Sequence, residues 1–128
     1  MVLHRKENIL KEKSEKFGGR ISKMYRYLMD VKGEETASKQ VYRSGTSIGA
    51  NIAESINAES NADFIHKLGI ALKEANETDY WLNTLHTGGY INDIEYDSMH
   101  NDNEEIIKIL VKSIKTKKER MGIDDSMR

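Results

Sequence analysis

Apolar residues recur along this chain at intervals of three and four, the spacing expected of α-helices that bury one face. The pattern predicts four helices, at about 7–31, 34–57, 61–87 and 93–118. The buried face of the first consists of Leu10, Phe17, Ile21, Met24, Tyr25 and Leu28. The third has the most regular spacing and carries Phe64, Leu68, Ala71, Leu72, Ala75, Thr78, Leu82 and Leu85. The sequence therefore predicts an all-α protein.

Stop and start signals fall between the predicted helices, where glycine ends a helix and a short polar side chain caps the next. These signals are Gly33, the Ser60 and Asp63 pair, Gly88-Gly89, and either Asn92 or Asp93. Short connections place successive helices antiparallel. We therefore expect a single domain over 1–128, an antiparallel up-down-up-down four-helix bundle with a disordered tail at 119–128.

The composition agrees with long solvated helices, because the chain has no proline, 38% hydrophobic and 32% charged residues. The absence of cysteine excludes disulfides, thiolate metal sites and a cysteine nucleophile. We expect a cytoplasmic protein with no membrane partner, since neither a signal peptide nor a membrane-spanning run is evident. A net charge of -1 means that any nucleic acid must bind at a local patch.

The fourth predicted helix is apolar over roughly 200°, against about 100° for a helix that buries a single face. Ile107 and Val111 belong to this wide arc. A second apolar side on a soluble helix is more often a subunit interface than an exposed patch. The chain is therefore predicted to associate with copies of itself, and Ile107 and Val111 are candidate interface residues.

The segment from Gly45 to Gly49 matches the G-x-S-x-G pattern of a hydrolase nucleophile turn. That turn needs a preceding strand, whereas this segment lies within a helical pattern. Gly45 and Gly49 instead predict a groove in which a neighbouring helix approaches closely. We expect no catalytic residues and no small-molecule substrate.

Two D-x-x-H pairs, Asp63 with His66 and Asp97 with His100, are similar to ligand pairs of di-iron bundles. Because the third and fourth helices run antiparallel, the pairs are expected roughly 30 Å or more apart. His86 and His4 have no partner at ligand spacing and are expected at the surface. The sequence therefore predicts no metal site and no cofactor.

One side of the first predicted helix carries a stripe of positive charge with an aromatic end. Its members are Lys13, Lys16, Arg20, Lys23 and Tyr27. Such a stripe can follow a phosphate backbone, so these are candidate RNA- or DNA-binding residues. The alternative is a solvated helix face with no partner.

A polar side of the second predicted helix carries further candidate contact residues. They are Arg43, Ser47, Asn51 and Glu54. On the third helix, Glu74 lies among Ile70, Trp81 and Leu85, where a buried carboxylate would need a partner. Arg43 is the predicted partner, in a structural ion pair at or near an interface that also includes Trp81.

Three blocks of the sequence, taken in order, resemble a known family. They are Arg43-Ser44-Gly45-Thr46-Ser47-Ile48-Gly49-Ala50-Asn51-Ile52-Ala53-Glu54, then Asp63-Phe64, and then Glu74-Ala75-Asn76-Glu77-Thr78-Asp79-Tyr80-Trp81-Leu82. The chain resembles the bacterial four-helix-bundle proteins encoded in intervening sequences of 23S ribosomal RNA genes. The resemblance implies ring-like homo-oligomers, with a pentamer as the expected form, and no catalytic residues. A related branch, the accessory proteins of diversity-generating retroelements, partners a reverse transcriptase and nucleic acid.

One departure from this family is Gly18-Gly19, where relatives carry helix-favouring residues. Each glycine costs about 1 kcal/mol relative to alanine within a helix, so we expect a kink or a close contact there. The sequence as a whole predicts a non-enzymatic homo-oligomeric bundle with weak nucleic-acid binding. The alternative is a structural or protein-partner scaffold that binds no nucleic acid.

Overall fold

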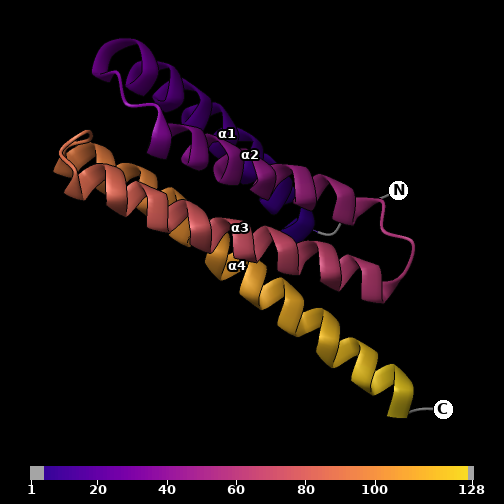
Figure 1. The fold of residues 1–128 in the computed structure, drawn as a ribbon. Coiled ribbons are helices and arrows are strands. Elements are labelled where there is room, and N and C mark those ends of the chain that lie inside the picture. Colours follow the sequence, from indigo (N-terminus) through magenta and orange to yellow (C-terminus); the bar gives the residue numbers. More distant parts are fainter. Residues whose placement is uncertain (1–4, 127–128) are drawn as a thin grey trace.

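The computed structural model describes residues 5–126, with Lys6 and residues 123–126 described as backbone only. Its helices are α1 (Arg5–Tyr27), α2 (Thr36–Ile56), α3 (Asn61–Thr87) and α4 (Asp93–Ser126). Successive helices run in opposite directions (Figure 1), so the predicted all-α up-down-up-down bundle is confirmed. α2 packs against α1 and α3, while α4 packs against α3 and, over a smaller area, α1.

The core is built from the apolar faces that the spacing predicted, with contributions from every helix. Burial of each such side chain stabilises the fold by about 1.5–3 kcal/mol. The largest fully buried side chains are Leu10, Phe17, Ile21, Leu28, Val41, Ile48, Ile52, Leu68, Leu82, Leu85, Ile106 and Leu110.

The first turn between helices is set by Gly33 and Glu34. Leu28–Lys32 (η1) continue α1 as a π-helical turn, and Gly33 ends it with φ 65°, a left-handed conformation that glycine adopts without strain. The Glu34 carboxylate accepts hydrogen bonds from the backbone N–H groups of Ala37 at 2.9 Å and Ser38 at 2.7 Å. α2 therefore begins at Thr36 and not at the predicted residue 34, because Glu34 caps the helix from outside it.

The other helix starts are capped by the side chains that the sequence indicated. Ser60 Oγ accepts a 3.0 Å hydrogen bond from the Asp63 N–H. Asn92 caps α4 reciprocally: its Oδ1 accepts from the Glu95 N–H at 2.8 Å, and its own N–H donates to Glu95 Oε1 at 2.9 Å. Of the two predicted alternatives, Asn92 is thus the cap.

Gly45 and Gly49 of α2 face α1 and allow it to approach, as predicted. A Cβ atom at position 45 would lie 2.8 Å from Ile21 Cγ1, and one at position 49 would lie 3.4 Å from the Ser14 carbonyl oxygen. Ser47 lies between the two glycines within α2, so the G-x-S-x-G match belongs to helix packing.

α1 is continuous through Gly18 and Gly19. Among the described residues, a Cβ atom at either position would meet nothing within 4 Å, so the expected close contact is not found. α4 is longer than predicted: it is helical to Ser126, which includes most of the segment expected to be disordered. Its last turns extend past the other helices (Figure 1), and residues 127–128 lie outside the described part. Within residues 5–126, no helix is both long and apolar enough to span a membrane.

Candidate functional site

The positive stripe of α1 faces the edge of α4. Lys13 Nζ lies 2.7 Å from Glu105 Oε1, and Arg20 Nη1 lies 2.5 Å from Asp102 Oδ2. Arg20 also donates a 2.8 Å hydrogen bond to Ser98 Oγ. Two of the four predicted phosphate-binding cations are therefore neutralised by carboxylates of a neighbouring helix.

The remaining members of the stripe are more available to a partner. Lys16 and Lys23 are exposed and have no ion pair among the described residues. They line a groove between α1 and α4 together with Lys13, Arg20 and Asp102. Tyr27 is 38% exposed, with the Lys32 ammonium 5.9 Å from its ring centroid. The free positive charge of this surface is thus reduced to two lysines.

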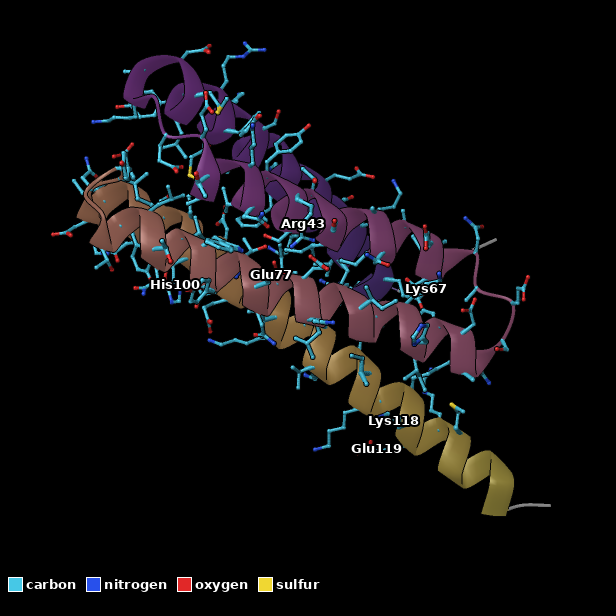
Figure 2. The ribbon with its side chains drawn as sticks, in the orientation of Figure 1. Arg43, Lys67, Glu77, His100, Lys118 and Glu119 are labelled. Atoms are coloured by element: carbon cyan, nitrogen blue, oxygen red, sulfur yellow. The ribbon has the colours of Figure 1, made fainter. Side chains whose placement is uncertain are left out.

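Arg43 of α2 reaches across to α3 and pairs with two carboxylates. Its Nη1 lies 3.2 Å from Glu74 Oε2, which is the predicted contact, and its Nη2 donates to Glu77 Oε1 (Figure 2). Trp81 Nε1 donates to the same Glu77 oxygen at 3.4 Å. Glu77 was not predicted as a partner of Arg43, although it lies one helical turn from Glu74 and that spacing places both carboxylates on the same side of α3.

The Arg43 cluster is satisfied within one chain. The hydrogen bond from Arg43 is the main reason that the pKa of the Glu77 carboxyl lies below its ordinary value, and it also raises the pKa of Arg43. The Glu74 side chain is 14% exposed and already has its counter-charge. Satisfying Glu74 therefore requires no second subunit.

The other candidate residues of α2 make contacts that stabilise the helix or its seam with α3. Ser47 Oγ donates to the Arg43 carbonyl at 2.6 Å, and Asn51 Nδ2 donates to the Ser47 carbonyl at 2.8 Å. Glu54 pairs with Lys67 of α3 at 2.9 Å. The Ser47 hydroxyl therefore donates to the backbone of its own helix, a contact typical of serine within helices.

The wide apolar arc of α4 is only partly used by the bundle. Ile106 and Leu110 are in the core, and Ile107, Ile109 and Ile114 pack partly buried against it. Val111 is 49% exposed, and Ile94 near the start of α4 is 80% exposed. The interface role of Ile107 and Val111 stays a prediction.

The histidines of the α3–α4 seam have partners that the sequence did not indicate. His100 Nδ1 lies 2.6 Å from Asp79 Oδ1 of α3, so its partner is not Asp97. His86, expected at the surface with no partner, lies 2.6 Å from Asp93 and is partly buried. The periodicity of one helix cannot identify such pairs, because they depend on how α3 and α4 are rotated about their axes.

Tyr96 lies between these two histidines and stacks on both. Its ring centroid is 4.5 Å from that of His86 and 5.3 Å from that of His100, with interplanar angles of 19° and 10°. Burial raises the pKa of the Tyr96 hydroxyl, and the carboxylates of Asp79, Asp97 and Glu104 raise it further. The α3–α4 seam thus combines a stack of three rings with the nearby carboxylates of Asp79, Asp97 and Glu104.

These features define a class of protein: an all-α four-helix bundle whose neighbouring helices are joined at their edges by ion pairs and hydrogen bonds. The chain matches the family described as 23S rRNA-intervening sequence protein over residues 6–112. It is also similar to a crystal structure of a protein of unknown function from the S23 ribosomal protein family of Bacteroides thetaiotaomicron. The two are 53% identical, with a TM-score of 0.85 and with 86% of this chain and 98% of that chain covered. No curated protein matches the chain.

The chain belongs to the 23S rRNA-intervening sequence protein family, because the match covers most of its length. The resemblance inferred from the Arg43–Glu54 and Glu74–Leu82 blocks is thereby confirmed.

Proposed function

We propose that this chain is a non-enzymatic helical bundle that associates with copies of itself and acts as a scaffold for macromolecular partners. One observation carries the proposal: Val111 is half exposed on α4, while Ile106 and Leu110 of the same helix are buried in the core. Val111 and the partly buried Ile107 lie one helical turn apart and give α4 a second apolar side, which another copy of the chain can cover.

The use of polar groups in the described bundle supports a role without chemistry. Arg43 holds Glu74 and Glu77, and Ser47 bonds to its own helix. General acid–base catalysis needs a titratable group held ready for a substrate, whereas these groups are engaged with one another. Their contacts stabilise the bundle, which suits a scaffold.

Light scattering on the purified chain tests self-association. The family resemblance leads us to expect a pentamer, with a mass five times that of the chain. The substitution Val111→Glu should shift the population to smaller species, because a charge buried in an interface is costly. Ile94→Glu is the matched control, since it replaces an even more exposed apolar residue of α4 outside the proposed interface. A monomeric mass for the unsubstituted chain would refute the proposal.

Weak nucleic-acid binding is a second proposed function, supported by exposed Lys16 and Lys23 along α1. Two lysines bind phosphate weakly, but repetition around an oligomer would strengthen the interaction. Fluorescence anisotropy with single-stranded RNA or DNA should show binding that weakens steeply with salt. Either single substitution, Lys16→Glu or Lys23→Glu, should weaken it and the double substitution should abolish it, whereas Lys108→Glu, the same charge change as either single substitution at an exposed position of α4, should have little effect. No binding at low salt would leave the protein-partner scaffold as the function.

A further inference from the structure

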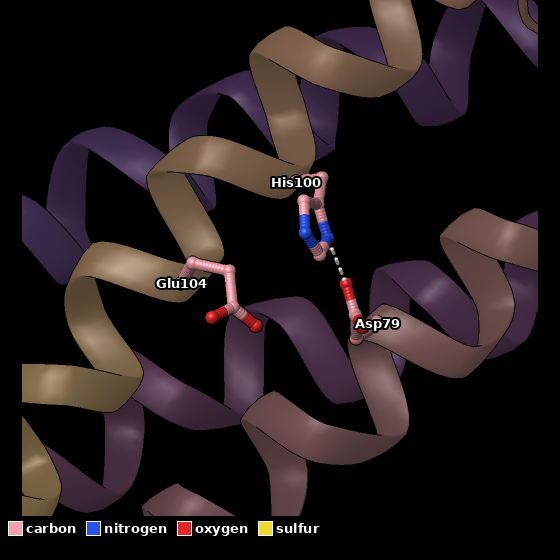
Figure 3. Close-up of side chains that lie close together, drawn as sticks. All are labelled: Asp79, His100 and Glu104. Carbon is pink, nitrogen blue, oxygen red and sulfur yellow. Dashed lines mark hydrogen bonds and ion pairs between the residues drawn. The ribbon is translucent and has the colours of Figure 1, made fainter.

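Three potential metal ligands converge where α3 and α4 meet. They are Asp79 of α3 with His100 and Glu104 of α4 (Figure 3), and one ligand atom from each lies within 4.8 Å of the others. His100 and Glu104 are four residues apart, so they lie on the same face of α4. The side chains of Asp79 and His100 are 32% and 30% exposed, so an ion could reach them from solvent.

This trio differs from several other interhelical carboxylates in the partner of its acidic groups. Arg43 pairs with Glu77, Arg20 with Asp102 and Lys67 with Glu54. Among the side chains that the structure describes, Asp79 pairs with His100, and no lysine or arginine pairs with Asp79 or Glu104.

The surroundings hold the trio in place. The Tyr96 ring lies nearly parallel to the His100 ring, which fixes the plane of the imidazole. Asn103 of α4 is fully buried and donates a 2.9 Å hydrogen bond to the Ala75 carbonyl of α3, which fixes the two helices against each other beside the site. Support of this kind around a ligand set orients it for an ion.

From this arrangement we infer that Asp79, His100 and Glu104 form a binding site for a divalent transition-metal cation of the zinc class. One imidazole and two carboxylates are ligands that Zn²⁺ and Co²⁺ accept readily, whereas Mg²⁺ prefers oxygen alone. The ion takes the place of the hydrogen bond between His100 Nδ1 and Asp79 Oδ1, whose hydrogen passes to solvent as a proton, and those two side chains move apart to reach ligand distances of about 2.0–2.2 Å. Water fills the remaining coordination positions. The ion thereby links α3 to α4 and stabilises the folded chain.

Zinc titration of the full chain, stripped with a chelator and free of an affinity tag, tests the site. We expect one Zn²⁺ per chain, with binding weakened at least about tenfold by Asp79→Asn, His100→Gln or Glu104→Gln. Co²⁺ should bind with a visible absorption band, and Mg²⁺ should bind more weakly than either. Zinc should raise the melting temperature of the unsubstituted chain but not that of His100→Gln.

Two control variants distinguish zinc bound by these three ligands from zinc attracted by the general negative charge of the surface. Asp97→Asn removes the same charge one turn from the trio, and His66→Gln removes an exposed histidine elsewhere. Both should bind zinc as the unsubstituted chain does, and circular dichroism confirms that each variant is folded. Absence of zinc binding, or equal weakening by Asp97→Asn and Asp79→Asn, would overturn the inference.

Discussion

Helix α1 is held on its two sides by different forces. Against α2, the absence of a side chain at Gly45 lets Ile21 approach so closely that a single added Cβ atom would lie 2.8 Å from it. Against α4, Lys13 and Arg20 reach partly exposed carboxylates. The seam with α2 thus depends on shape, and the edge with α4 depends on solvated charge. An added methyl group should therefore destabilise the seam with α2, whereas added salt should weaken the contacts at the edge with α4.

The largest effect is expected from Ile21→Ala, which would leave a cavity where α1 meets α2. Ile21 is fully buried, and such truncations cost about 2–5 kcal/mol of unfolding free energy. Urea denaturation at matched protein concentration measures this loss. Truncating the adjacent Arg20 to alanine, at the α4 edge, is the control and should cost about 1 kcal/mol or less.

Gly45→Ala should have the next largest effect, since it adds a methyl group where there is no room. Overpacking costs about 1–3 kcal/mol, only partly offset by the preference of alanine for helix, about 1 kcal/mol. Gly69→Ala within α3 is the matched control, because an added Cβ atom there meets nothing within 4 Å among the described residues. If Gly45→Ala and Gly69→Ala changed the urea midpoint in the same direction, the close packing proposed at Gly45 would be contradicted.

Gly19→Ala should change stability in the opposite direction, although it lies on the same helix as Ile21. An added Cβ atom meets no described atom within 4 Å, so only the helix preference remains, about 1 kcal/mol in favour of alanine. The urea midpoint should rise. A fall would contradict the expected gain from helix preference.

The seam with α2 and most helix ends could be predicted from the sequence because their determinants are local. Gly33, Ser60 and Asn92 act on their own helix ends, and the spacing of Gly45 and Gly49 indicates a groove without knowledge of its occupant. These signals depend on residues three or four apart in one segment, which periodicity reports directly.

The ion-paired edges and the metal-ligand trio could be predicted only in part. The Arg43–Glu74 pair was found because a carboxylate among apolar neighbours needs a counter-charge. The pairing of Arg20 with Asp102 and of His100 with Asp79 depends on the rotation of each helix about its own axis, which a single sequence does not give. The spacing within each helix indicated only the D-x-x-H pairs, which lie at opposite ends of α3 and α4, whereas the structure brings Asp79 of α3 to His100 of α4.

The Arg20–Asp102 contact should contribute little, and its contribution should depend on salt. A double-mutant cycle with Arg20→Ala and Asp102→Ala is expected to give a coupling of about 0.2–1 kcal/mol at low ionic strength. Near 1 M salt the Debye length is about 3 Å, so the coupling should fall towards zero. A coupling that persists at high salt would mean that this edge is as specific as the seam with α2.

An effect of similarly small size is expected at the Arg43–Glu77 pair, and it should depend on pH. Because the folded-state pKa of Glu77 lies below its ordinary value, the pair stabilises the fold above the unfolded-state pKa and loses this contribution as pH falls through the folded-state pKa. Glu77→Gln should therefore lower the unfolding free energy by about 1 kcal/mol or less near pH 7 and by less in acid. Thermal unfolding of both chains over a pH series measures this difference. A difference that stays constant into the acid range would mean that the Glu77 side chain contributes through packing beside Trp81, as Ile21 does in the seam with α2, and not through its charge.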